Sequence, residues 1–397
     1  ITIWKGINRM KITRCLLPIF MICIFLFCGC TGSVKSEIEE VIRGELDLLQ
    51  DLDSDSAMKY ISYNELFPNV ESGELSDRVK EVYSLFFESF NYKILDISVN
   101  KKEKTAVSGL RITTIDTKAL SIDFASSYLR QQITKASTAD SGAVEEVDDL
   151  SGRYLLLHEL LTDNKYDTVD IEGTIELKET ENGWEIQHSY SLEDFLVGGL
   201  MTHLSDPDIL SPKDTLAIYL EAVKTVDLSK MSEFLGLDTP FAGSDPDKHA
   251  IATELTEQIH NTFDFEIVSQ ETNGYTASVK TNITTFDSDT ILREYHKELD
   301  RYLETIDAVE SGAEQRYKKS LAYLLTAIQN NTATKASSVT FHLINDGVSW
   351  KLLDNSIELG NAVLGTLTSS PLNENTGNDT SHNQDDYSSD NAYYNNY

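Results

Sequence analysis

The sequence predicts an α+β protein made of two tandem domains, each a four-stranded antiparallel sheet wrapped by helices. The 397 residues are enough for two or three domains of ordinary size. Two halves of the chain carry matching segments in the same order. Each half also alternates between helical apolar spacing and short runs rich in β-branched residues, which favours mixed helices and strands.

The internal repeat is clearest in one pair of segments. Residues 105–116 and 276–287 are identical at six of twelve positions, where average composition would give about one. Other matches follow in order: residues 90–94 with 263–267, 151–156 with 320–325, Trp184 with Trp350, and 195–200 with 362–367. Collinear matches of this kind indicate a duplicated domain.

Each copy is expected to open with an amphipathic helix. The apolar positions are Ile38, Val41, Ile42 and Leu49 in the first copy, and Leu216, Tyr219, Leu220 and Val223 in the second. Ser36 with Glu39 fits a capping box, which predicts that the first helix begins there. Ser211 before Pro212 predicts the start of the corresponding helix in the second copy.

The remaining elements are predicted in the same order in both copies. A second helix (79–90 and 251–263) precedes two strands, and the second strand ends at 116 or 287. A helical pair follows over 119–163 and 289–330, and a hairpin closes each sheet, 168–179 with 183–189 and 338–344 with 348–354. In the second pair, a helical stripe is predicted at Ile291, Tyr295, Leu299, Tyr302, Ile306 and Val309.

The N-terminal residues predict export. Met10 is followed by Lys11, Arg14 and an apolar run over 15–28, which is typical of a secretory signal peptide. The run is shorter than the roughly 20 residues that span a bilayer. Because the sequence begins with Ile1, residues 1–9 are expected to be an upstream extension that is not translated.

All four cysteines lie in the first thirty residues, at Cys15, Cys23, Cys28 and Cys30. This excludes a disulfide-stapled body and a zinc site built on thiolates. Phe27-Cys28-Gly29-Cys30 resembles the lipobox of bacterial lipoproteins, although Phe27 replaces the usual Leu. The resemblance implies that Cys30 becomes the first residue after cleavage and carries the lipid, whose acyl chains include palmitate. The alternative is ordinary signal cleavage nearby, which would leave a free thiol.

The predicted organisation has six parts. They are an upstream extension and signal peptide (1–29), a lipidated tether (30–36), the first repeat (37–203), a linker (204–211), the second repeat (212–367) and a disordered polar tail (368–397). Removing the first 29 residues removes four basic and no acidic residues, which changes the net charge from −32 to −36. Such a charge repels anionic headgroups, so the lipid alone must hold the protein at the membrane.

The predicted sheet and helices resemble the cone-shaped nuclear-transport-factor-two-like (cystatin-like) fold. More narrowly, the chain resembles tandem-domain lipoproteins of unknown function from Gram-positive bacteria. The lipobox, the opening helices that end at Asp53 and Asp227, the Ile-Thr-Thr-x-Asp strand ends and the hairpin Trp carry this resemblance. It implies a location on the outer face of the cytoplasmic membrane, facing the cell wall or exterior.

Candidate catalytic residues are few. Asp116 and Asp287 end equivalent strands, and some enzymes of the superfamily that the chain resembles use such an Asp as a general base. The alternative is that each Asp caps the next helix. Asp51, Asp53 and Asp55 resemble the start of a calcium loop but lack its later Gly and Glu. Trp184 and Trp350 fit the hairpin core better than a ligand platform. We expect no cofactor and no metal.

The leading hypothesis is a non-catalytic binding or interaction module in the cell envelope. Its expected partners are the membrane, through Cys30, and an envelope protein, a peptide or a small apolar ligand. Nucleic acid is not expected, because Lys and Arg number 33 against 65 Asp and Glu. The alternative is an isomerase or dehydratase that uses Asp116 or Asp287, and a third possibility is a structural spacer.

Overall fold

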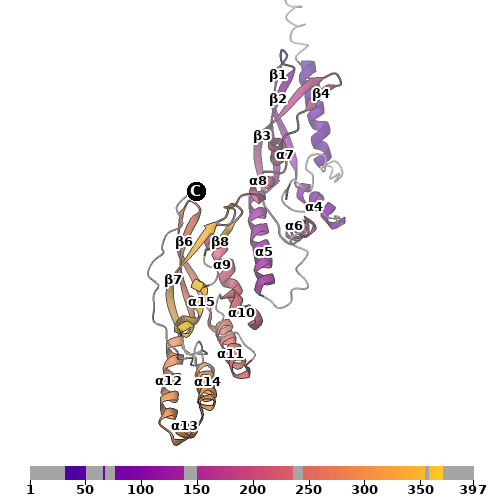
Figure 1. Ribbon diagram of the computed structural model, residues 1–397. Coiled ribbons are helices and arrows are strands. Elements are labelled where there is room, and N and C mark those ends of the chain that lie inside the picture. The colour runs from indigo at the N-terminus through magenta and orange to yellow at the C-terminus, as the bar shows by residue number, and fades with distance from the viewer. Residues whose placement is uncertain are drawn as a thin grey trace, which may run out of the picture.

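The computed structural model describes residues 32–50, 66–67, 77–137, 150–235, 245–353 and 357–369. It contains two four-stranded antiparallel sheets, in the orders β1-β2-β3-β4 and β5-β6-β7-β8, with helices packed against each. The two sheets follow one another along an elongated molecule (Figure 1). The predicted fold class is therefore confirmed.

The first copy opens with a helix over residues 32–50, and a helical pair separates its second and third strands. The other elements are α4 (Asp77–Phe87), β1 (Asn91–Asn100), β2 (Thr105–Ile115), α5 (Thr117–Ser137), α6 (Leu150–Asp163), β3 (Thr168–Thr180), β4 (Gly183–Ile186), α7 (Tyr190–Leu196) and α8 (Leu200–Leu204).

The second copy repeats this order with small changes in length. Its elements are α9 (Pro212–Val223), α10 (Leu228–Phe234), α11 (Pro246–Thr262), β5 (Asp264–Asn273), β6 (Thr276–Phe286), α12 (Ser288–Leu303), α13 (Ile306–Glu310), α14 (Ala313–Gln329), β7 (Thr334–Asn345), β8 (Trp350–Leu352), α15 (Ile357–Leu364) and η2 (Gly365–Ser369).

Both sheets carry the same irregularity. The register of β1 against β2 shifts between Ile94 and Asp96, and that of β5 against β6 shifts between Ile267 and Ser269. The intervening Leu95 and Val268 are exposed apolar residues. A bulge at matching positions of both edge strands supports duplication at the level of backbone geometry.

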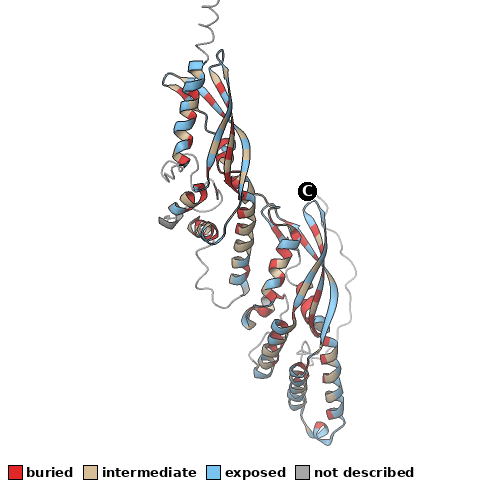
Figure 2. Ribbon diagram, turned by 180° about the vertical axis from the view of Figure 1, so that it is seen from behind, coloured by how far each residue is buried: buried red, intermediate tan, exposed pale blue. Residues whose placement is uncertain are grey.

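Each sheet buries one face, which Figure 2 shows as alternating red and lighter residues along the strands. Val279, Thr281 and Ile283 on β6 are fully buried, and the residues between them are more exposed. Trp184 and Trp350 are both buried, as expected for hairpin core residues. The Nε1 atom of Trp350 donates to Asp208 Oδ1 at 2.9 Å, which fastens the segment between the copies to the second sheet.

Two local predictions are wrong. The first helix already includes residues 32–35, so Ser36 does not cap its start, and the residues predicted as tether beyond 31 are helical. The predicted helical stripe includes Ile306 and Val309, but these two side chains are 74% and 79% exposed. The stripe fails there because α12 ends at Leu303 and a separate short helix, α13, begins after Thr305, whose side chain accepts a hydrogen bond from the N–H of Ala308.

The copies meet where α5 of the first packs against α9 and α10 of the second. Ile133, Leu210 and Ile218 form a buried apolar cluster there, and Ile122, Ala125, Leu129 and Ala222 pack around it. Arg130 Nη2 lies 3.4 Å from Glu221 Oε2 at the edge of this cluster. The interface is thus a small core with a polar margin, comparable to other contacts between domains.

The helix α12 is the counterpart of α5, since each begins directly after a capping Asp. Counted from those caps, Ile122, Ala125, Leu129 and Ile133 correspond to Arg293, His296, Asp300 and Glu304. Arg293, His296 and Asp300 on α12 and Glu304 at its C-terminal cap are all exposed. The surface of α5 that joins the copies is therefore apolar, whereas the matching surface of α12 is charged or polar.

Among the described residues, no helix combines the length and apolar character that crossing a membrane requires. The predicted signal peptide and Cys30 lie outside the described residues. So do the possible calcium-loop residues 51–55 and most of the predicted tail.

Candidate functional site

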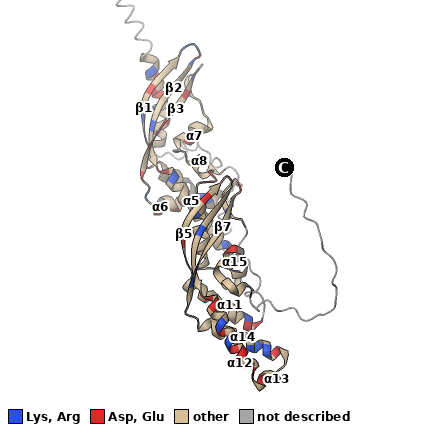
Figure 3. Cartoon of the chain, turned by 90° about the vertical axis from the view of Figure 1, so that its left-hand side faces the viewer, with Lys and Arg blue, Asp and Glu red and all other residues tan. Residues whose placement is uncertain are grey.

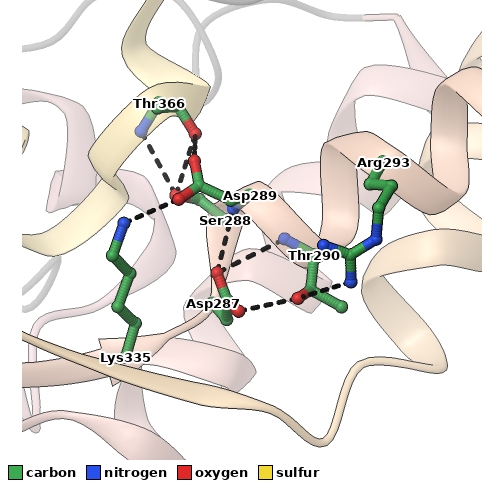
Figure 4. Close-up of polar contacts among 7 residues, drawn as sticks. All are labelled: Asp287, Ser288, Asp289, Thr290, Arg293, Lys335 and Thr366. Carbon is green, nitrogen blue, oxygen red and sulfur yellow. Dashed lines mark hydrogen bonds and ion pairs between the residues drawn. The ribbon is translucent and has the colours of Figure 1, made fainter.

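Asp116 and Asp287, the speculative catalytic residues, serve as helix caps in the structure. Asp287 Oδ1 accepts hydrogen bonds from the N–H groups of Asp289 at 3.1 Å and Thr290 at 3.3 Å (Figure 4). Asp116 Oδ1 accepts one from the N–H of Ala119 at 3.0 Å. Neither Asp lines the pocket described next. The observed geometry thus gives both carboxylates the capping role.

A pocket of about 400 Å³ lies in the second copy, between the inner face of the sheet and the closing segment α15–η2. Its floor is apolar and its rim is polar. The lining residues are Thr285, Phe286, Ser288, Lys335, Ser337, Val339, Glu358, Asn361, Ala362, Gly365 and Thr366. This size and this mixture of surfaces are typical of sites for small molecules.

Polar contacts hold one side of the pocket together, as Figure 4 shows. Lys335 Nζ lies 2.6 Å from Asp289 Oδ2, and Thr366 Oγ1 donates to Asp289 Oδ1 at 2.9 Å. The Thr366 N–H donates to Ser288 Oγ at 3.2 Å. The hydrogen bond from Lys335 lowers the pKa of Asp289, and the same contact raises the pKa of Lys335. Both groups therefore stay charged over the physiological range of pH.

The opposite side of the pocket carries a carboxylate. Glu358 Oε1 lies 2.8 Å from His342 Nδ1, and the backbone N–H of His342 donates to Glu358 Oε2 at 3.2 Å. These contacts orient the Glu358 side chain, which is about one-third exposed. The pocket rim thus carries Lys335, which is paired with Asp289, and the oriented carboxylate of Glu358.

In the first copy, the ring of Phe195 fills the space that is equivalent to this pocket. Gly173 and Val339 occupy equivalent positions in the two sheets, because each pairs with the matching residue of the preceding strand. Phe195 aligns in sequence with Ala362. A Cβ atom added to Gly173 would lie 2.5 Å from the Phe195 ring, so this ring rests directly on the strand. In the second copy the smaller Ala362 leaves the space open.

This pocket was missed by sequence analysis, although a signal was present. The segments 195–200 and 362–367 align in sequence, and Phe195 against Ala362 is the largest loss of volume in that alignment. Its meaning depends on Gly173 and Val339, which face these positions from another strand. Only the pairing of the sheet brings the two differences together.

His, Asp and Glu side chains occur throughout the part of the chain that the structure describes. Within that part of the chain, no group of three or more His, Cys, Asp and Glu residues is placed to hold a metal ion. His158 instead lies 3.1 Å from Glu81, on the surface between α4 and α6.

Comparisons with known proteins add little. No family model matches the chain, and no curated protein matches it. One solved structure, described as "a putative lipoprotein (ycdA)" from Bacillus subtilis, aligns with 70% of this chain and 97% of its own length at 12% identity and a TM-score of 0.28. A likeness this weak carries no argument about fold or function.

Proposed function

We propose that this chain is an exported lipoprotein, anchored through Cys30 to the outer face of the cytoplasmic membrane, that binds a small ligand in the pocket of its second copy. The support for the location is the basic residues and short apolar run before Gly29-Cys30. The proposal assigns the protein no catalytic role, because Asp116 and Asp287 are occupied as helix caps.

The observation that carries the binding role is the difference between the copies. Duplication gives both copies the same sheet, yet Phe195 fills the first and Ala362 leaves the second open. The rim of the open pocket presents Lys335 and Glu358, and its floor presents Phe286, Val339 and Ala362. We therefore propose a small organic ligand with polar or charged ends and a short apolar part, rather than a wholly apolar one.

Lipid attachment can be tested by metabolic labelling with a palmitate analogue. The Cys30→Ala variant is expected to lose the label and to leave the membrane fraction. The Cys28→Ala variant is the matched control, because Ala also satisfies the need for a small residue before Gly29, and it should keep the label. A Cys30→Ala protein that still carries label would overturn the anchoring part of the proposal.

The pocket can be tested by filling it in the way the first copy does. A Val339→Gly, Ala362→Phe double variant reproduces the Gly173–Phe195 pair and is expected to fold. Native mass spectrometry of the protein extracted from its own membrane should show a bound small molecule in the wild type and none in the variant. A ligand retained by the folded double variant would refute binding at this pocket.

A further inference from the structure

A second concave site, of about 410 Å³, lies on the helical hairpin of the second copy. It occupies the space between α12, α14 and the segment that leads from α14 into β7. The lining residues are Thr290, Glu294, Glu298, Tyr323, Thr326, Ala327, Asn330, Asn331, Thr332 and Ala333. None of these residues lines the pocket beside α15, so the two sites are separate.

The first copy shows what occupies this space when it is filled. The connections over 164–167 and 330–333 have equal length and end in the same contact. Asp116 N donates to Asp167 O at 2.8 Å, and Asp287 N donates to Ala333 O at 2.9 Å. One residue earlier in each connection, Tyr166 therefore corresponds to Thr332.

Counting from the capping aspartates pairs the next two groups. Asp123 on α5 corresponds to Glu294 on α12. In the first copy, the hydroxyl of Tyr166 donates to Asp123 Oδ2 at 3.0 Å, and its ring packs against the first core. Burial raises the pKa of Tyr166 to about 12, so its hydroxyl keeps the proton that it donates.

In the second copy the acceptor remains and the aromatic residue is absent. Thr332 is exposed, and Glu294 and Glu298 line the site together with the Tyr323 ring. Lys297 Nζ lies 2.7 Å from Glu294 Oε2, and Arg301 Nη1 lies 2.7 Å from Glu298 Oε2. Figure 3 shows Lys and Arg interspersed with Asp and Glu along α12 and α14. The hydrogen bond from Lys297 lowers the pKa of Glu294, which keeps this carboxylate ionised and able to accept a hydrogen bond.

We propose that the site between α12 and α14 binds a tyrosyl group, whose hydroxyl donates to Glu294 as Tyr166 does to Asp123. The site supplies the same acceptor type, on the same face of the equivalent helix, and a cavity where the first copy has its own tyrosine. A phenol bonded to a carboxylate is a charge-assisted hydrogen bond, which is stronger than a bond between neutral groups.

Two sources could supply the tyrosyl group. One is this chain itself, because Tyr387, Tyr393, Tyr394 and Tyr397 follow the second copy. The other is a separate protein or peptide. Both present the same chemistry to Glu294, so the experiment must separate them.

The test is an NMR titration of the full mature chain with N-acetyl-L-tyrosinamide, repeated on a chain whose four tail tyrosines are changed to Phe. N-acetyl-L-phenylalaninamide lacks the hydroxyl and is expected to bind about tenfold more weakly, the loss typical of one hydrogen bond to a charged group. Tighter binding of the tyrosinamide to the Phe-substituted chain would identify the tail as the natural occupant. Equal binding to both chains would point to a separate partner.

Variants of the site make the test decisive. Thr332→Tyr should supply the ring from within and abolish binding in a folded protein, and Glu294→Gln should weaken binding about tenfold. Asp123→Asn, the matched change in the first copy, should leave binding unchanged. Absence of tyrosinamide binding in both chains would overturn the proposal, as would phenylalaninamide binding with equal affinity. Filling the pocket beside α15 should not affect this titration, so failure here is distinguishable from failure of the proposed function.

Discussion

Replacing Ile133 by Ala should uncouple the two copies. Ile133 is 5% exposed in the cluster between α5 and α9. The substitution removes three carbon atoms, which at about 0.8 kcal/mol per buried CH₂ amounts to roughly 2.4 kcal/mol before any cavity term. Most of this free energy should be lost from the contact between copies, because Ile133 packs with Leu210 and Ile218 rather than with the first core.

Urea unfolding monitored by tryptophan fluorescence can detect this loss. In a chain that begins at Cys30, and so lacks Trp4, Trp184 and Trp350 place one buried reporter in each copy, and changing either to Phe isolates the other. With a slope of about 2 kcal/mol/M, the less stable copy should unfold about 1 M earlier in the variant. Ile306→Ala is the matched control, since Ile306 is 74% exposed, and it should shift neither transition measurably. Equal shifts from both variants would refute the reasoning.

Three further predictions concern local features. Gly198 has φ +65°, and an added Cβ atom would lie 2.6 Å from a threonine methyl carbon, so Gly198→Ala should destabilise the fold by about 1–3 kcal/mol. Gly274 has φ +59° but open space around it, so Gly274→Ala should destabilise the fold less. Thermal unfolding of the two variants compares these losses. Asp116→Ala should lower the free energy of unfolding by about 1 kcal/mol in the same assay, and Asp116→Asn should change it little, because Asn also caps helices. An Asn variant that is as unstable as the Ala variant would contradict the capping role. The hydrogen bond from Lys351 lowers the pKa of Asp346 from its ordinary value of 3.8 to about 2. The contact therefore stabilises the fold fully at pH values above 3.8, and this stabilisation is lost as the pH falls towards 2. Acid titration of Asp346→Asn should lack that component, and an unchanged acid transition would contradict the assignment.

Most of the fold could be predicted because the duplication makes each half a check on the other. The strands β2 and β6 end at Ile115 and Phe286, within one residue of the predicted ends at 116 and 287. The end of α12 was missed because the apolar spacing continues past Leu303, while the break depends on Thr305 capping a new helix. Hydrophobic periodicity does not report such a break when no Gly or Pro marks it.

The candidate sites could not be predicted in the same way. Conserved features of the repeat, such as Asp116 and Asp287, attract attention in sequence, yet they are structural caps. Both cavities lie instead where the copies differ, at Ala362 and at Thr332. A difference of this kind becomes informative only when a residue on another element is known to face it.

The polar surface of α12 has a consequence for self-assembly. If the second copy kept the apolar residues of α5 on its equivalent helix, that helix would present an unpaired apolar face, and further molecules could add there head to tail without limit. Arg293, His296, Asp300 and Glu304 replace the apolar side chains that would allow such growth. The second copy therefore lacks, at the matching positions, the apolar side chains through which α5 joins the two copies.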